Sequence, residues 1–139
     1  KARNLANVRL IPSQPKALMP GLWSVHDLAL IPLRGQELFA TVIPSKIFEA
    51  MAMGTPVLLS VPQGEATRLV RAAGCGIVIP PEDSQAMADA IVRLQQNPDE
   101  RARFRAAGLA AASQYGRDKQ AALMLHVLRM VCDKVRSPS

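Results

Sequence analysis

The sequence predicts an α/β protein in which helices cover both faces of an open parallel sheet. Apolar runs of strand length alternate with helical patterns on a cycle of roughly 20 to 25 residues, which is typical of this class. Two of the runs, residues 28–33 and 56–61, are apolar almost throughout, as in strands that are buried on both sheet faces. Apolar residues make up 49% of the 139 residues, which is enough for a core.

Four short apolar runs are expected to form strands. Proline ends the first run at Pro12 and the last at Pro80, because proline cannot donate a ladder hydrogen bond. The intervening segments are long enough for helical crossovers, which are almost always right-handed. The expected strands are residues 7–12, 28–33, 56–61 and 76–80.

Proline, glycine and capping residues indicate where the helices begin and end. Pro20 fits only a first turn, so the first helix should begin near Met19. Gly54 and Gly74 stand where left-handed residues end a helix, and Asp83 suits an N-cap. The expected helices are residues 19–25, 44–53, 65–73, 85–96, 99–115 and 119–135.

Apolar residues at helical spacing predict the buried faces of two of these helices. They are Met87, Ala90, Ile91 and Leu94 in the helix at 85–96, and Leu123, Val127, Met130 and Val131 in the last helix. We therefore expect both helices to pack against the body of the protein.

The net charge of +6 favours anionic partners, but the pattern does not favour nucleic acid. The basic residues are scattered apart from Arg101, Arg103 and Arg105. The aromatic residues are three Phe, one Tyr and one Trp, and only Phe104 lies within a basic run, which is too little for a platform that stacks single-stranded bases. Since no helix-turn-helix or zinc-finger spacing occurs either, we expect no nucleic-acid partner.

The cysteines and histidines predict neither a disulfide nor a metal site. Cys75 and Cys132 lie far apart in apolar settings, which indicates a reduced, buried pair. His26 and His126 have no Cys, Asp or Glu at ligand spacing. No apolar run approaches the roughly 20 residues that span a bilayer. The chain starts without Met or a signal peptide, just before a strand, so we expect a fragment truncated at its N-terminal end.

Residues 41–57 contain the groups of a phosphate and diol site. Pro44 suits a first helical position, and apolar residues follow at helical spacing. Ser45 and Lys46 at a helix start can bind an anion through free N–H groups, the helix dipole and the ammonium. Glu49 has apolar neighbours, so its carboxylate should be paired or lie in a cleft, where it can accept hydrogen bonds from hydroxyls. A phosphate beside a diol indicates a nucleotide sugar.

Other polar residues follow the expected strands, at the sheet edge where open α/β proteins bind ligands. Arg34 and Glu37 are each either a solvated charge or a substrate contact, and Gly35 permits close ligand approach. Glu65 is either a site residue or a favourable charge at a helix N-terminus. The segments at this edge are Pro12 and Ser13, the loop at 34–43 and residues 63–65.

Several motifs together resemble one enzyme family. They are PSKIFEAMAMGTPV at 44–57, Gly64-Glu65, and GCGIVIPPED at 74–83 before an Ala-rich helix. With them the chain resembles the Rossmann-like, donor-binding C-terminal half of GT-B glycosyltransferases, and more narrowly the retaining family 4 (glycosyl transferases group 1). The Pro-Ser-Lys variant is similar to its fucosamine-transferase-like branch. The resemblance implies that residues 1–139 are the nucleotide-sugar binding domain of a two-domain chain.

The resemblance also implies roles for individual residues. Glu49 would bind the ribose hydroxyls of the nucleotide. Thr41 stands where the family has a carboxylate that contacts the donor sugar, so this position departs from the family pattern. The last helix resembles the one that crosses back to the acceptor-binding half. The backbone at Ile43, Pro44, Ser45 and Lys46 would hold the diphosphate, and the base would lie near Ile11, Pro12 and Ser13.

The implied reaction transfers a sugar, with retention, from a UDP-linked or similar donor to a glycan or lipid-linked acceptor in bacterial surface polysaccharide or lipopolysaccharide synthesis. The helix dipole and cations, rather than a metal, would stabilise the leaving diphosphate, so we expect no cofactor. We expect a cytoplasmic location, with peripheral contact at the cytoplasmic face of the inner membrane as an option. The chain alone should bind nucleotide weakly and catalyse nothing.

Two other functions stay open. A nucleotide-sugar epimerase of the same fold needs acid and base carboxylates and a histidine in the cleft, for which the sequence offers no convincing candidates. A non-catalytic nucleotide-sugar binding module is favoured by Thr41. The absence of Gly-x-Gly-x-x-Gly, Walker and Gly-x-Ser-x-Gly motifs disfavours dehydrogenases, NTPases and serine hydrolases.

Overall fold

A computed structural model, which describes residues 5–136, contains a three-stranded parallel sheet. The strands are β1 (Ala29–Pro32), β2 (Val57–Ser60) and β3 (Gly76–Ile79), in the spatial order β1-β2-β3. The register pairs Val57 with Ala29 on one side and with Gly76 on the other. The α/β class and the open parallel sheet that the sequence predicts are confirmed.

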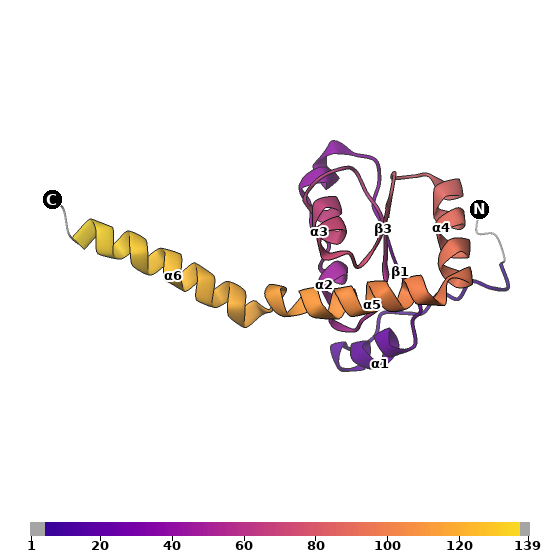
Figure 1. Cartoon of the computed structure of the whole chain (residues 1–139), viewed down its shortest axis with the longest axis horizontal. Coiled ribbons are helices and arrows are strands. Elements are labelled where there is room, and N and C mark those ends of the chain that lie inside the picture. The colour runs from indigo at the N-terminus through magenta and orange to yellow at the C-terminus, as the bar shows by residue number, and fades with distance from the viewer. Residues whose placement is uncertain (1–4, 137–139) are drawn as a thin grey trace.

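Helices cover both faces of the sheet, as predicted. α2 and α3 pack against one face and α4 against the other, while α5 runs across α2 (Figure 1). Most boundaries lie within a few residues of the expected ones. The helices are α1 (Met19–Ser24), α2 (Ser45–Ala52), α3 (Glu65–Ala73), α4 (Ser84–Gln96), α5 (Pro98–Ala112) and α6 (Arg117–Arg136), with 3-10 turns η1 (Lys16–Leu18), η2 (Glu37–Thr41) and η3 (Ser113–Tyr115).

The core lies mainly between the sheet and the layer of α2 and α3. Ile47 and Met51 of α2 and Val70 of α3 are fully buried there. On the other face, Leu58 of β2 packs against Ala90 of α4. Because β2 is central and buried on both faces, its residues need no polar alternation, which explains its apolar sequence.

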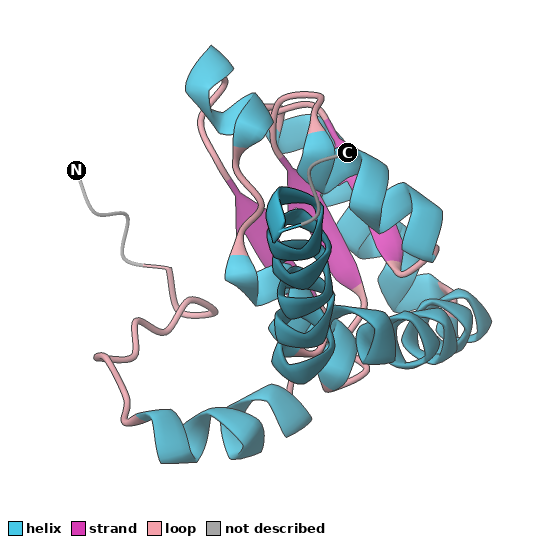
Figure 2. Cartoon of the chain, turned by 90° about the vertical axis from the view of Figure 1, so that its left-hand side faces the viewer, coloured by secondary structure: helices cyan, strands magenta, loops and turns pink. Residues whose placement is uncertain are grey.

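The strand predicted at residues 7–12 does not form. The segment is a loop that lies outside the sheet, to one side of it (Figure 2), and Leu10 is 94% exposed. A short run becomes a strand only when a sheet edge pairs its backbone groups, and no edge does so here. Pro12, which has no N–H, further weakens the run as a ladder partner.

β1 is buried on one face only, so the prediction of burial on both faces at 28–33 is wrong for this strand. Leu30 is 47% exposed. The cause is position: β1 is an edge strand, and α4 lies mainly over β2 and β3. In α4 itself, Ala90 and Leu94 are buried as predicted, whereas Ile91 is partly exposed.

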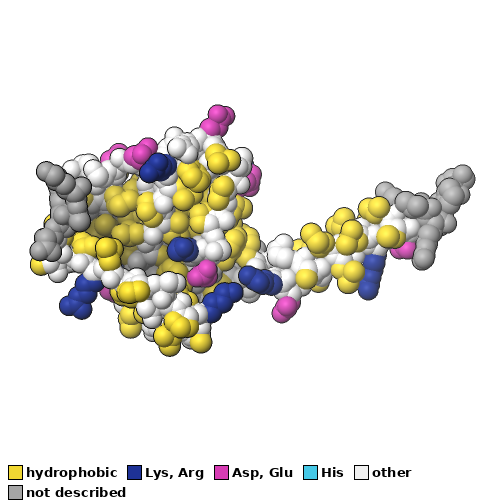
Figure 3. Space-filling view, turned by 180° about the vertical axis from the view of Figure 1, so that it is seen from behind, with side chains coloured by type: hydrophobic (Ala, Val, Ile, Leu, Met, Phe, Trp, Pro, Cys, Tyr) yellow, Lys and Arg dark blue, Asp and Glu magenta, His cyan; other side chains and the backbone are white. Residues whose placement is uncertain are grey.

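α6 extends away from the body of the protein, and its main packing contact is with η3 (Figures 1 and 2). Hydrophobic side chains line the extended helix (Figure 3). The predicted burial of its apolar face is therefore wrong, because no described element lies beside that face. No helix within residues 5–136 is long and apolar enough to cross a membrane. The residues predicted as buried but at least half exposed are Leu123, Val127, Met130 and Val131.

The two cysteines are free thiols in different environments. Cys75 is buried in the core, and this burial raises the pKa of its thiol. Cys132 lies on α6 and is exposed. The prediction of a reduced, buried pair therefore holds for Cys75 and is wrong for Cys132, because the helix that carries it does not pack on the core.

A buried carboxylate joins α4 to α5. Glu100 of α5, which is 8% exposed, accepts hydrogen bonds from the Nε (2.9 Å) and Nη2 (2.5 Å) of Arg93 of α4. Arg103 lies 3.5 Å from the same carboxylate. The Arg93 hydrogen bonds do most to lower the pKa of Glu100; burial opposes them and the two positive charges add to them.

We expect the Glu100→Gln variant to lose part of the acid sensitivity of folding. Because the pKa of Glu100 is lowered in the folded chain, the ion pair stabilises the fold above the ordinary carboxyl range, and this contribution is lost as pH falls through the folded pKa. Urea unfolding at about pH 7 and about pH 3 should differ less for the variant than for the wild type. Asp99→Asn, in the same helical turn, is the control; an undiminished difference in Glu100→Gln would contradict this role.

Candidate functional site

The start of α2 leaves its backbone donors without a side-chain cap. Pro44 is the N-cap, with extended backbone, rather than the predicted first helical residue, and the helix begins at Ser45. Ile47, which donates to the Pro44 carbonyl at 3.1 Å, fixes the first turn against the core. Free N–H groups and the positive end of the helix dipole therefore face outward at this point.

Glu49 is exposed, with two hydrogen-bond donors on its carboxylate. The Ser45 hydroxyl donates to Oε1 at 3.3 Å, and the Trp23 indole N–H donates to Oε2 at 3.3 Å. The apolar neighbours along the chain did not bury Glu49, because only the face with Ile47, Ala50 and Met51 meets the core. The carboxylate is thus paired, as expected, and it stays accessible at the surface.

A first cavity lies between the N-terminal loop, α1, β1 and α2. It has a volume of about 470 Å³, and Trp23 and the exposed side of β1 line it. Three predicted site residues also line it: Ile11, Pro12 and Lys46. The structure therefore brings the expected base segment and the expected phosphate lysine to one cavity, although residues 11 and 12 follow no strand.

A second cavity of about 570 Å³ lies between α2, α3 and the start of α6. Ile43, Ser45 and Glu49 line it, so the carboxylate that is expected to bind ribose and part of the segment expected to hold the diphosphate meet here. The aromatic rings of Phe48 and Tyr115, whose centroids are 5.3 Å apart, form another part of the wall. The cavity combines a carboxylate, hydroxyls and aromatic rings, which suits a ligand with polar edges and an apolar face.

The loop after β1 holds the predicted residues that the structure keeps apart from α2. The Gly35 N–H donates to the Glu82 carboxylate at 3.2 Å, and Arg34 lines a separate cavity of about 310 Å³ with Glu82. The Thr41 hydroxyl donates to the Leu38 carbonyl at 3.0 Å within η2. Arg34, Gly35, Glu37, Thr41 and Ser13 are all exposed.

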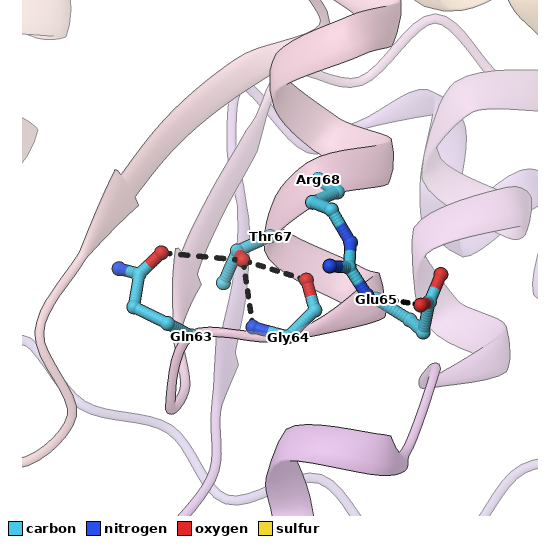
Figure 4. A network of polar contacts seen from close by, with 5 residues as sticks. All are labelled: Gln63, Gly64, Glu65, Thr67 and Arg68. Carbon is cyan, nitrogen blue, oxygen red and sulfur yellow. Dashed lines mark hydrogen bonds and ion pairs between the residues drawn. The ribbon is translucent and has the colours of Figure 1, made fainter.

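The α3 N-terminus packs against η2, and Glu65 lies at the start of this helix. Glu65 forms an ion pair with Arg68, as Figure 4 shows. The Thr67 hydroxyl accepts from the Gly64 N–H at 3.0 Å and lies 2.8 Å from its carbonyl (Figure 4). A Cβ at Gly64 would lie 1.8 Å from the Ala40 carbonyl oxygen, so glycine allows η2 to touch this turn.

Two residues contact predicted site residues although the sequence did not point to those contacts. Trp23 lay in a helix pattern as one more apolar residue, and nothing in its spacing pointed to Glu49, which is 26 positions away. Glu82 has a positive φ of 60°, unusual for a non-glycine residue, which aims its carboxylate at Gly35. Within residues 5–136, no group of three or more His, Cys, Asp or Glu side chains is placed to hold a metal.

Residues 1–97 match the family described as glycosyl transferases group 1. The chain belongs to this family. All the candidate residues, from the N-terminal loop to α3, lie within the matched region. Over 105 residues the chain is also 36% identical to a phosphatidyl-myo-inositol mannosyltransferase of Mycobacterium leprae (strain TN). That alignment covers 76% of the chain and 27% of the relative, so the chain spans about a quarter of the relative's length.

Membership of the glycosyl transferases group 1 family confirms the resemblance at the family level. The matched relative is named as a mannosyltransferase, and its name does not bear on fucosamine. The fucosamine-transferase-like branch therefore stays a prediction. The roles of Glu49, Lys46 and the other candidate residues are likewise predictions, for which the geometry above gives the starting point.

Proposed function

We propose that this chain binds the donor nucleotide sugar of a longer, two-domain glycosyltransferase. The observation that carries the proposal is the exposed carboxylate of Glu49, one turn from the uncapped start of α2, in a chain of the glycosyl transferases group 1 family. A carboxylate at this position can accept both ribose hydroxyls while the helix start receives a phosphate. The relative is much longer than this chain, which leaves room for an acceptor-binding domain.

Each part of the donor then has a place along α2. The ribose lies at Glu49, and the diphosphate at the backbone of Ile43 to Ser45 with Lys46 beside it. The base lies toward the first cavity, near Ile11 and Pro12. Ser13 and Arg34 contribute at the margin, where both are exposed. Glu65, which pairs with Arg68 at the start of α3, also contributes at the margin.

In the proposed reaction, the bond between the anomeric carbon of the sugar and the diphosphate oxygen breaks, and the acceptor hydroxyl takes the sugar with retention. Negative charge grows on the leaving diphosphate. The α2 dipole and Lys46 offset that charge without a metal ion. The acceptor is a glycan or a lipid-linked glycan of a bacterial surface polysaccharide, and UDP is the first nucleotide to test. The proposed location of the reaction is the cytoplasm.

A non-catalytic nucleotide-sugar binding module is the alternative. Thr41 favours it, because the Thr41 side chain carries no charge and its hydroxyl is already donated to the Leu38 carbonyl. A module of this kind would keep Glu49 and bind the nucleotide but would not activate the sugar. Nothing in the geometry favours an epimerase.

A screen of donor hydrolysis and transfer on the full-length protein tests the proposed function. We expect one class of UDP-, GDP- or TDP-linked sugar to be consumed with release of its nucleoside diphosphate. Chelation with EDTA should leave the rate unchanged, since the leaving group is stabilised by the helix and by cations. Binding without turnover of any donor would favour the non-catalytic module. A product with inverted stereochemistry, or loss of activity in EDTA, would contradict the proposed mechanism.

A further inference from the structure

Trp23 makes a contact that neither its position in the sequence nor the proposed reaction explains. Its indole Nε1–H donates to Oε2 of Glu49 at 3.3 Å, across the boundary between α1 and α2. The Ser45 hydroxyl donates to the other oxygen, Oε1, at 3.3 Å. Each oxygen of the carboxylate is thereby tied to a different element, which restricts rotation about the last torsion of the Glu49 side chain.

The ring of Trp23 is itself held in place. It is half-buried and packs against the core formed by β1, β2 and α2. The His26 ring lies next to it, with centroids 5.7 Å apart and a tilt of 56°. An indole has only two side-chain torsions, so a packed ring can hold its N–H in one direction at little entropic cost.

Trp23 also lies between the two cavities beside α2. Its ring lines the first cavity together with Lys46, while its N–H reaches Glu49, which lines the second. A carboxylate has about four lone-pair sites, and Trp23 and Ser45 occupy one on each oxygen. The remaining sites stay available for the two hydroxyl groups of a vicinal diol.

We infer that Trp23 is a positioning residue for Glu49 and sets the carboxylate to bind the ribose diol of the nucleotide. This inference rests on the proposed function for the ligand, but the contact itself can be tested without one. Trp23 does not touch the diol; it acts through Glu49. Its removal should therefore weaken ligands that carry the diol and spare those that lack it.

The contact is tested first in the free chain, where Trp23 is the single tryptophan and gives one indole N–H signal. In ¹H–¹⁵N spectra of the 139-residue chain, Glu49→Ala should move this signal and speed the exchange of its proton. Asp89→Ala, an exposed carboxylate on α4 at the other sheet face, is the matched control and should change neither. Equal indole spectra in wild type and Glu49→Ala would overturn the inference, whatever the nucleotide results are.

The second test compares two nucleotides in the wild type and in the Trp23→Phe variant. This variant keeps an aromatic ring but loses the indole N–H. The probes are UDP and 2′,3′-dideoxyuridine diphosphate, with affinities taken from chemical shifts. Trp23→Phe should weaken UDP roughly two- to tenfold and leave the dideoxy analogue unchanged. Equal weakening of both nucleotides means that Trp23 only supports the fold, which would overturn the inference.

The outcomes of the two proposals can be told apart. If wild type binds neither nucleotide but the indole signal responds to Glu49→Ala, the proposed function fails and the Trp23 to Glu49 contact stands. If wild type binds UDP better than the dideoxy analogue and Trp23→Phe keeps that preference, the proposed function stands and the positioning role fails. Thermal unfolding of Trp23→Phe shows whether the variant is folded, and the indole test decides if it is not.

Discussion

Glu49→Ala should weaken nucleotide binding roughly 10- to 100-fold. The variant loses hydrogen bonds from the ligand to a charged carboxylate, and such bonds contribute about 1.5 to 3 kcal/mol. Glu49 is exposed and lies off the buried face of α2, so its removal leaves no cavity and no unpaired charge in the core. The free energy of unfolding should therefore change by less than about 0.5 kcal/mol. Calorimetric titration of the full-length protein with UDP, together with urea unfolding, measures the two effects separately.

Asp89→Ala is the matched control for this variant. Asp89 is also an exposed helical carboxylate that accepts one side-chain hydrogen bond, in its case from Gln85 at 2.9 Å. It lies on α4, away from both cavities beside α2. We expect the Asp89→Ala variant to bind UDP with the affinity of the wild type. Equal affinities in Glu49→Ala and Asp89→Ala would mean that Glu49 does not contact the ribose.

Gly76→Ala should destabilise the fold by about 3 kcal/mol or more, a large part of the total for a domain of this size. A Cβ at Gly76 would lie 1.9 Å from the carbonyl oxygen of Val57 in the neighbouring strand. Val57 is central and fully buried, so it cannot move aside. β3 would have to separate from β2 and lose ladder hydrogen bonds, which urea unfolding should report as a lower midpoint.

Gly21→Ala controls for the change from glycine to alanine. An added Cβ at Gly21 in α1 meets nothing within 4 Å, so the variant should be neutral or more stable by about 0.5 to 1 kcal/mol. If Gly76→Ala lowers the free energy of unfolding by less than about 1 kcal/mol, Gly76 does not lie as close to the Val57 carbonyl as described. The register between β2 and β3, which sets that approach, would then be wrong.

Local patterns predicted the elements of this fold well where a neighbour covers them. The apolar run of β2 and the glycine stops at Gly54 and Gly74 correspond to a central strand and to two residues with positive φ. Patterns failed where the outcome depends on a partner surface. The run at 7–12 finds no edge to pair with, and the apolar face of α6 finds no surface to pack on. Amphipathic spacing identifies the apolar face of a helix, but it does not show whether another element covers that face.

The candidate site shows the same division between local and long-range information. Ser45 and Glu49 lie one turn apart on α2 and line the same cavity, as helical spacing predicts, whereas Lys46 lines the other cavity. The approach of Trp23 to Glu49 and of Gly35 to Glu82 spans 26 and 47 positions. Contacts of that kind depend on how helices pack, which no local pattern contains. The predicted edge at Pro12 and Ser13 also failed as a strand end, because the strand is absent.

The most direct test of the central claim is a titration of the ¹⁵N-labelled chain with UDP, GDP and TDP at millimolar concentration. If α2 holds the donor nucleotide, the amide signals of residues 43–49 should shift or broaden with at least one of the three. Signals from α4, on the other face of the sheet, should stay unchanged. If all three nucleotides leave the amide signals of residues 43–49 unchanged, the nucleotide site is not at the start of α2.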